Sequence, residues 1–322
     1  MRKFTAPLHW DIEYLRAMAK IQNSSAQVVE LYGCLNYYEL PNGRIPLAHQ
    51  NISIPEAQNI RKTLREYGSS FAYLVNGPLA KTAQKASDLA SPLTKMMADL
   101  EPDAVVISEP QIGRVIRDIN STIPIHISSI ASVETINDLE RFKEVKPHRL
   151  ILAHDVPKDE GKLISLLGHC QASGMEVECM VTESCLYRCP LKAQHYAAIA
   201  SGRDDSEFHA YCLKQRLSDP RKFLEAGSFL RPQDLFRYDD LGINIYKISG
   251  RSKGLEWLLN TIRIYLSGHY EGDLLEIMGI STKNREHIPF EVPCHSINPA
   301  DTSLTTTYQQ IQPKSPSPGF NQ

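Results

Sequence analysis

The chain has 322 residues, 42% of them hydrophobic, which is enough to bury the core of one large domain or of two ordinary ones. A formal net charge of −2 excludes a general electrostatic attraction to nucleic acid or to an anionic membrane, so a nucleic-acid partner has no support from charge. No window approaches 18 consecutive apolar residues, so we predict no membrane span. Seven cysteines, an odd number with no secretory signal before them, predict a cytoplasmic protein with reduced thiols.

Eight strand-like runs recur along the chain with helix-like segments between them. They cover residues 3–8, 27–33, 70–77, 104–110, 124–130, 149–155, 176–182 and 242–249. No hairpin turn joins neighbouring runs, which favours parallel pairing. The pattern predicts an α/β fold, a (β/α)8 barrel of the TIM type that forms a single domain over residues 1–280. A doubly wound open sheet is the alternative.

Helical periodicity occupies the gaps between the strands. The first helix begins after Asp11, which can cap it, and the second has Pro55 in its first turn. Ile60, Leu64 and Tyr67 are spaced to form the core face of that second helix. Further helices are predicted near residues 93–100, 112–119, 133–145, 161–173 and 257–270.

Two segments interrupt the barrel pattern. An irregular insertion that carries cysteines follows the seventh strand, over residues 183–230. Residues 281–322 form a C-terminal extension that becomes rich in Ser, Thr, Pro and Gln. Such a composition buries too little apolar surface to offset its ordering entropy, so we predict disorder from about residue 296.

Four cysteines are expected at the C-terminal ends of the predicted strands. Cys34 follows the second strand, Cys185 and Cys189 follow the seventh, and Cys212 lies in the same insertion. Barrel enzymes build their sites at this end, so the four thiols are expected to meet there. Four thiolates can hold a [4Fe–4S] cluster or, alternatively, zinc. His195 is a weaker candidate ligand, because an ordinary surface histidine on a helix explains it better.

Alternation along the strands indicates which side chains face the barrel interior. Cys179 shares the parity of its apolar neighbours, faces the helices and is therefore also a weaker ligand. The residues predicted to face inward include Glu30 and the four candidates for catalysis, which are Lys247, Arg251, His126 and Glu178. Arg44, Lys247 and Arg251 are expected to hold an anionic substrate group, because guanidinium groups suit carboxylate and phosphate. The alternative is a set of internal ion pairs that only stabilise the barrel.

Three stretches resemble one known family. They are ELYG at residues 30–33, CLYRCP at residues 185–190 with His195 and Tyr196 after it, and the run that begins FLRPQDLF at Phe229. Over roughly residues 4–275 the chain resembles peptidase family U32. The resemblance implies a barrel-like fold with a cysteine-bound iron–sulfur cluster, and Cys34 matches a ligand that one subgroup takes after its second strand. The cysteine-rich insert of the family is longer than the one found here.

The resemblance implies two kinds of activity. Some members of the family were described as collagen-degrading peptidases, and others support oxygen-independent hydroxylation of ubiquinone precursors or of pyrimidines in RNA. Our leading interpretation is an iron–sulfur-dependent enzyme or enzyme subunit that hydroxylates or otherwise redox-modifies a small molecule or nucleobase. A U32-type peptidase and a non-catalytic, cluster-bearing partner of a paralogous subunit are the alternatives. The sequence contains no G-x-x-x-x-G-K-[ST] or H-E-x-x-H motif.

Overall fold

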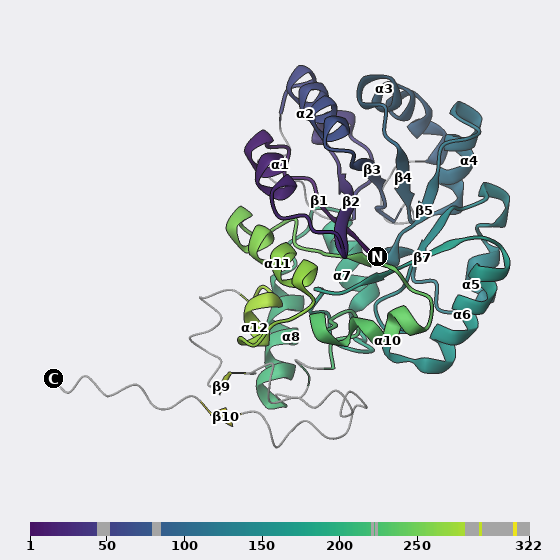
Figure 1. The fold of residues 1–322 in the computed structure, drawn as a ribbon. Coiled ribbons are helices and arrows are strands. Elements are labelled where there is room, and N and C mark those ends of the chain that lie inside the picture. Colours follow the sequence, from purple (N-terminus) through teal and green to yellow (C-terminus); the bar gives the residue numbers. More distant parts are fainter. Residues whose placement is uncertain are drawn as a thin grey trace.

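The computed structural model describes residues 1–43, 52–78, 85–219, 222, 225–280, 290–291 and 312–313. Eight parallel strands close into one barrel in chain order, and β1 pairs with β8 to complete it (Figure 1). The strands are β1 (Arg2–Pro7), β2 (Ala26–Gly33), β3 (Ser70–Val75), β4 (Ala104–Ile107), β5 (Ile125–Ile127), β6 (Arg149–Ile151), β7 (Glu176–Met180) and β8 (Ile245–Lys247). The predicted TIM-type barrel is confirmed, and the closure excludes an open, doubly wound sheet.

Helices surround the barrel on its outer side (Figure 1). The helices are α1 (Ile12–Ala19), α2 (Ile54–Glu66), α3 (Ala90–Leu100), α4 (Pro110–Ile119), α5 (Ile136–Glu140), α6 (Glu160–Ala172), α7 (Lys192–Ala200), α8 (Ser206–Ser218), α10 (Leu235–Asp240), α11 (Leu255–Ser267) and α12 (Leu274–Ile277), of which α7 and α8 belong to the insertion after β7. The core lies between the strands and the apolar faces of these helices, as well as inside the barrel. Buried apolar area of this kind is the main favourable contribution to folding.

Local signals in the sequence explain where the first helices start. The Asp11 side chain accepts a hydrogen bond from Tyr14 N and caps α1 as predicted. Ser53 and Glu56 form a reciprocal capping box at the start of α2. The prediction that Tyr67 faces the core is wrong, because this residue caps the end of α2 and is 42% exposed.

One predicted helix is much shorter than its sequence pattern suggests. The pattern predicts a helix over residues 133–145, but α5 covers only Ile136–Glu140. Thr135 caps this helix in a capping box with Asp138, so the preceding residues lie outside it. A separate turn of 3-10 helix follows at Lys143–Val145.

The insertion after β7 contains two helices of its own, α7 and α8. An isolated bridge between Thr182 and Phe229 closes the base of the insertion. Of the C-terminal extension beyond residue 280, the structure describes two short strands, β9 (Phe290–Glu291) and β10 (Gln312–Pro313). They pair antiparallel with each other. Most of the segment from residue 296, where we predict disorder, lies outside the described residues.

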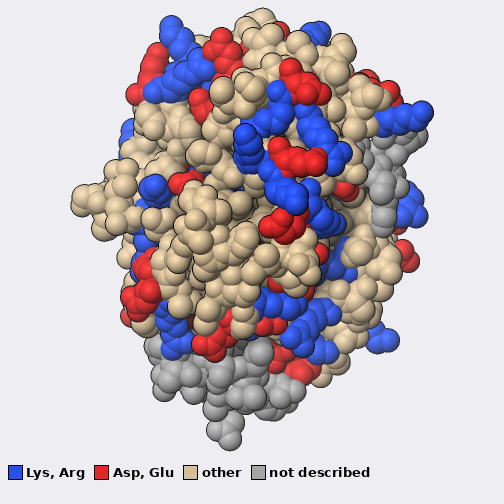
Figure 2. Space-filling model, turned by 90° about the vertical axis from the view of Figure 1, so that its right-hand side faces the viewer, with Lys and Arg blue, Asp and Glu red and all other residues tan. Residues whose placement is uncertain are grey.

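Charged side chains of both signs are interspersed on the face of the molecule shown in Figure 2. A broad area of that face carries neither acidic nor basic side chains. None of the helices in the described part of the chain is both long and apolar enough to cross a membrane.

Candidate functional site

A network of buried charges fills the barrel interior. The Arg149 guanidinium at the start of β6 lies 3.0 Å from Glu30, 2.9 Å from Glu176 and 3.2 Å from Glu178. Lys247 Nζ, at the end of β8, lies 3.6 Å from Glu178 Oε1. The inward orientation that alternation predicts for Glu30, Glu178 and Lys247 is therefore correct. Since every charge has an opposite partner, the network can be buried without isolated ions.

Two of the three carboxylates of this network, Glu30 and Glu178, differ in their protonation. Burial raises the pKa of Glu30 to about 7, against the opposing effect of Arg149. Burial also raises the pKa of Glu178, but the Lys247 ammonium and the Arg149 guanidinium outweigh it, so this pKa lies below its usual value. Glu178 is therefore the firmly ionised member, and it also accepts a hydrogen bond of 2.5 Å from Thr5 Oγ1.

His126 lies in the same interior layer, with Nδ1 3.8 Å from Glu30 Oε1. Burial and the nearby Arg149 and Lys247 charges hold the pKa of His126 well below its usual value, so the imidazole is neutral. Neither His126 nor Glu178 lines the pocket at the mouth of the barrel. Their proposed catalytic roles stay predictions.

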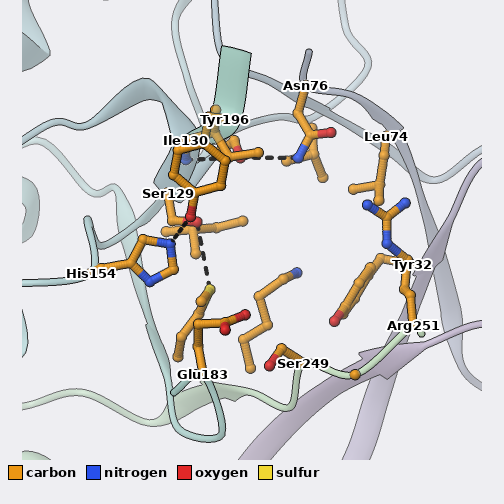
Figure 3. Close-up of a pocket in the computed structure, with 16 residues that line it drawn as sticks. Tyr32, Leu74, Asn76, Ser129, Ile130, His154, Glu183, Tyr196, Ser249 and Arg251 are labelled. Carbon is orange, nitrogen blue, oxygen red and sulfur yellow. Dashed lines mark hydrogen bonds between the residues drawn. The ribbon is translucent and has the colours of Figure 1, made fainter. Parts of the chain in front are cut away.

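This pocket opens above the charge network, at the C-terminal ends of the strands. Its volume of about 60 Å³ holds a few water molecules or one small polar group. Figure 3 shows His154, Tyr196 and Glu183 on one side of the pocket and Tyr32, Leu74 and Arg251 on the other. Lys247 and Asn76 also line it. The Lys247 ammonium lies 3.4 Å from the centre of the Tyr32 ring, which helps to hold the cation in place.

His154 and Tyr196 form a hydrogen-bonded pair at the pocket wall (Figure 3). The two rings are also stacked, with centroids 5.9 Å apart. Ser228 donates its hydroxyl proton to the carbonyl oxygen of His154, so it can only accept from His154 Nδ1, 3.0 Å away. In the neutral imidazole this arrangement leaves Nε2 to accept the Tyr196 hydroxyl proton. The pair is thus arranged to hold or pass a proton at the pocket.

Arg251 connects the pocket to the first of the predicted metal ligands. Its Nη1 lies 3.3 Å from Cys34 Sγ and 3.2 Å from Asn42 Oδ1. Asn42 Nδ2 also contacts the Cys34 thiol. The predicted ligand Cys34 therefore lies at the mouth of the barrel, against Arg251. Arg44, the other predicted anion-binding residue, lies outside the described residues.

The other three predicted thiol ligands come together in the insertion. Cys212 on α8 is hydrogen-bonded to Cys189, and Cys185 interacts electrostatically with both. Burial raises the pKa of Cys185 to about 12, and Glu183 and the neighbouring thiols act in the same direction. The guanidinium of Arg216, buried on α8, interacts electrostatically with all three thiols. A buried cation beside three thiols suits a group that binds them as thiolates.

Cys179 lies apart from these three thiols. It is fully buried and interacts with Tyr238 and Tyr246, on the helix side of the sheet. The alternation argument for its orientation is confirmed.

The spacing of the three thiols bears on which group they could bind. Within the described ranges, the only three potential ligands with all their ligand atoms within 4.8 Å of one another are His195, Asp205 and His209. Cys185, Cys189 and Cys212 do not meet this limit as a set, so at least one pair of their sulfur atoms is more than 4.8 Å apart, whereas the ligands of one tetrahedral zinc ion lie about 3.8 Å apart. In an iron–sulfur cluster, different iron atoms bind the thiolates, so a wider spacing is compatible with it.

Comparison with known proteins places the chain in a family. The sequence model of peptidase family U32 matches residues 22–268. The chain belongs to peptidase family U32. An uncharacterized protease of Methanocaldococcus jannaschii is 24% identical to this U32 protein over 182 residues, which are 55% of this chain and 53% of the relative. The chain thus matches about half the length of that curated relative.

Solved structures resemble this U32 protein in fold. The U32 peptidase Mk0906 has a TM-score of 0.52 and 13% identity, over 78% of this chain and 93% of its own. A phosphoribosyl anthranilate isomerase has a TM-score of 0.43 and 10% identity, over 83% of this chain and 98% of its own. The likeness to Mk0906 supports the barrel fold.

Several pocket residues were not predicted from the sequence. Asn76 and His154 each follow a strand closely, which is the position where barrel enzymes place functional side chains, so a positional signal for them existed. Tyr196 was noted only as the neighbour of His195, and no local pattern shows that it reaches the pocket. The central role of Arg149 was also missed, because it depends on partners from β2 and β7.

Proposed function

We propose that this U32 protein is an iron–sulfur enzyme that binds a small polar or anionic group in the barrel mouth and modifies it by a redox reaction. One observation carries the proposal. Glu183 lines the pocket and also interacts electrostatically with Cys185 and Arg216 of the thiol cluster. A group held by the thiols would therefore lie next to the substrate pocket. Oxygen-independent hydroxylation of a small molecule or nucleobase is the reaction that the family resemblance implies.

Cys185, Cys189 and Cys212 would hold the cluster, and Arg216 would balance part of its negative charge. A cluster bound there would supply electron transfer. With the pKa of Cys185 raised to about 12, this thiol stays protonated unless iron or another metal ion displaces the proton. Cys34, on the Arg251 side, stays the predicted fourth ligand.

The pocket residues have separate roles in this proposal. Lys247 and Arg251 attract an anionic or carbonyl-bearing group, and Asn76, whose amide donates to Ser128 Oγ, lines the pocket as a further polar contact. The hydrogen-bonded His154 and Tyr196 can take up or give a proton at the pocket. Because the pocket is small, it would accept one end of a substrate and leave the rest outside.

The peptidase alternative has weaker support in the geometry. The described contacts of His154 include one with a serine, Ser228, which could suggest a nucleophile–base pair. Ser228 is completely buried, does not line the pocket and already donates its proton to a backbone carbonyl. It therefore cannot serve as an exposed nucleophile in this arrangement.

The proposal is tested by electron paramagnetic resonance of the anaerobically purified chain after reduction with dithionite. A cluster signal is expected, and Glu183→Gln should change its shape, because Glu183 borders both the cluster and the pocket. Cys34→Ala in the same series tests the predicted fourth ligand. An iron-free chain that hydrolyses a panel of peptides would instead establish the peptidase alternative.

A further inference from the structure

Two histidines from different helices of the insertion converge on one carboxylate oxygen. His195 Nε2 on α7 and His209 Nε2 on α8 both lie 3.2 Å from Asp205 Oδ2. The ligand atoms of all three residues lie within 4.8 Å of one another. We propose that His195, Asp205 and His209 form a binding site for a divalent transition-metal ion, with Zn²⁺ as the best match.

The distances fit the coordination sphere of such an ion. Zinc binds histidine nitrogen and carboxylate oxygen at about 2.0–2.2 Å, so neighbouring ligands of a tetrahedral ion lie roughly 3.3 Å apart. Both measured nitrogen–oxygen separations are 3.2 Å. The remaining edge, between the two histidines, can shorten because the His209 side chain is 68% exposed and has room to turn. Two imidazoles and one carboxylate are a donor set that zinc accepts, with a position left for water.

The side chain of Asp205 is turned toward the two histidines and away from its usual role. Asp205 occupies the N-cap position of α8, where an aspartate ordinarily accepts a hydrogen bond from the first backbone N–H groups of the helix. No such bond forms here. The carboxylate thereby forgoes the helix cap and contacts the two imidazoles instead.

Packing holds His195, the ligand on α7, in position. The His195 ring is stacked on Phe208, with centroids 5.0 Å apart and an angle of 11° between the planes. The His195 and His209 rings meet edge to face at 5.2 Å. A ligand fixed by such packing loses little conformational freedom when it binds a metal ion.

The proposed ion would connect α7 to the start of α8 and so stiffen the insertion. Cys212 lies three residues after His209 on α8, so the site adjoins the helix that carries one of the thiols. The inference does not rest on the proposed iron–sulfur function, because none of its three ligands is a thiol.

The test uses the full-length chain after dialysis against a chelator, titrated with Zn²⁺ and separately with Co²⁺. His209→Ala and Asp205→Asn should each weaken Zn²⁺ binding at least ~10-fold, since each removes a ligand or its charge. His269→Ala is the matched control, because His269 is a similarly exposed histidine 3.1 Å from one carboxylate, Glu271. Its affinity for Zn²⁺ should equal that of the wild type.

Co²⁺ reports which atoms bind the ion. The visible cobalt bands of a nitrogen and oxygen site should appear without the strong thiolate-to-cobalt absorption. Zn²⁺ binding that is unchanged in His209→Ala, or a cobalt spectrum dominated by thiolate absorption, would overturn the proposal. Iron measured in the same samples separates this site from the thiol cluster, because His209→Ala should keep the iron content of the wild type.

Discussion

Lys247 Nζ lies 3.6 Å from Glu178 Oε1, so a lysine that lines the pocket is paired with a carboxylate in the barrel interior below it. The Glu178 side chain is completely buried and is held also by Arg149 and Thr5. A substitution in this pair would therefore change both the stability of the barrel and the charge of its pocket. A substrate anion would meet a cation whose position is already fixed.

The first prediction concerns this ion pair. Lys247→Met should lower the free energy of unfolding by about 2–4 kcal/mol, because it leaves Glu178 buried with one fewer cation. Glu178→Gln made in the same chain should restore part of that loss, and urea unfolding of the two single variants and the double variant measures the coupling. If the change in unfolding free energy of the double variant equals the sum of the changes in the two single variants, the two side chains do not interact.

The second prediction concerns pH. The pKa of Glu30 is raised to about 7, so between about pH 4.5 and 7 the folded chain holds a proton that the unfolded chain releases. The contribution of Glu30 to stability is therefore complete at low pH and is lost as the pH rises through 7. Glu30→Gln should remove this loss, so its unfolding free energy should fall less than that of the wild type between pH 5 and 7.5. Equal changes in both proteins would contradict the pKa assigned to Glu30.

The third prediction concerns the tautomer of His154. The hydrogen bonds of Ser228 require the proton of the neutral imidazole to lie on Nδ1, which leaves Nε2 to accept from Tyr196. Nitrogen-15 chemical shifts of the labelled chain should show this tautomer. Ser228→Ala should weaken the preference, while Tyr196→Phe, which retains the stacked ring, should leave the Nδ1 proton in place. A proton on Nε2 in the wild type would contradict the assignment.

The fourth prediction uses two glycines. A Cβ atom at Gly227 would overlap the carbonyl oxygen of His154 and lie 2.8 Å from Asp155 Oδ1. Gly227→Ala should therefore destabilise the chain by about 1–3 kcal/mol and shift the His154 resonances. Gly168→Ala, in α6 with no atom within 4 Å of the added Cβ, is the control and should stabilise by about 0.5–1 kcal/mol. If denaturant unfolding shows that both variants are more stable, or both less stable, than the wild type, this packing would be contradicted.

The eight strand-like runs with helical segments between them were sufficient to predict the barrel, and alternation along the strands predicted the inward direction of Glu30, Glu178 and Lys247. These residues are constrained locally, because neighbours in a strand must face opposite sides. Strand ends were predicted less well. The runs at 124–130, 149–155 and 242–249 form only the three-residue strands β5, β6 and β8. Apolar composition does not show where pairing with a neighbouring strand stops.

The site itself depends on contacts that sequence spacing does not reveal. Arg149 acts as the central cation because the register of β6 against β7 sets it beside Glu176, with Glu178 opposite Ile151. Asp205 and His209 meet His195 only because the insertion folds α7 back against the start of α8. Cys185 and Cys189 could be predicted as neighbours from their spacing, and Cys212 from its place in the same insertion.

The iron and acid-labile sulfide content of the anaerobically purified chain tests the central claim most directly. The wild type, Cys185→Ala and Cys179→Ala are compared, because the first substitution removes a clustered thiol and the second a thiol on the helix side. We predict about four iron atoms per wild-type chain, lost in Cys185→Ala and retained in Cys179→Ala. A folded wild-type chain without iron, or equal iron in both variants, would contradict a cluster held by the thiols of the insertion.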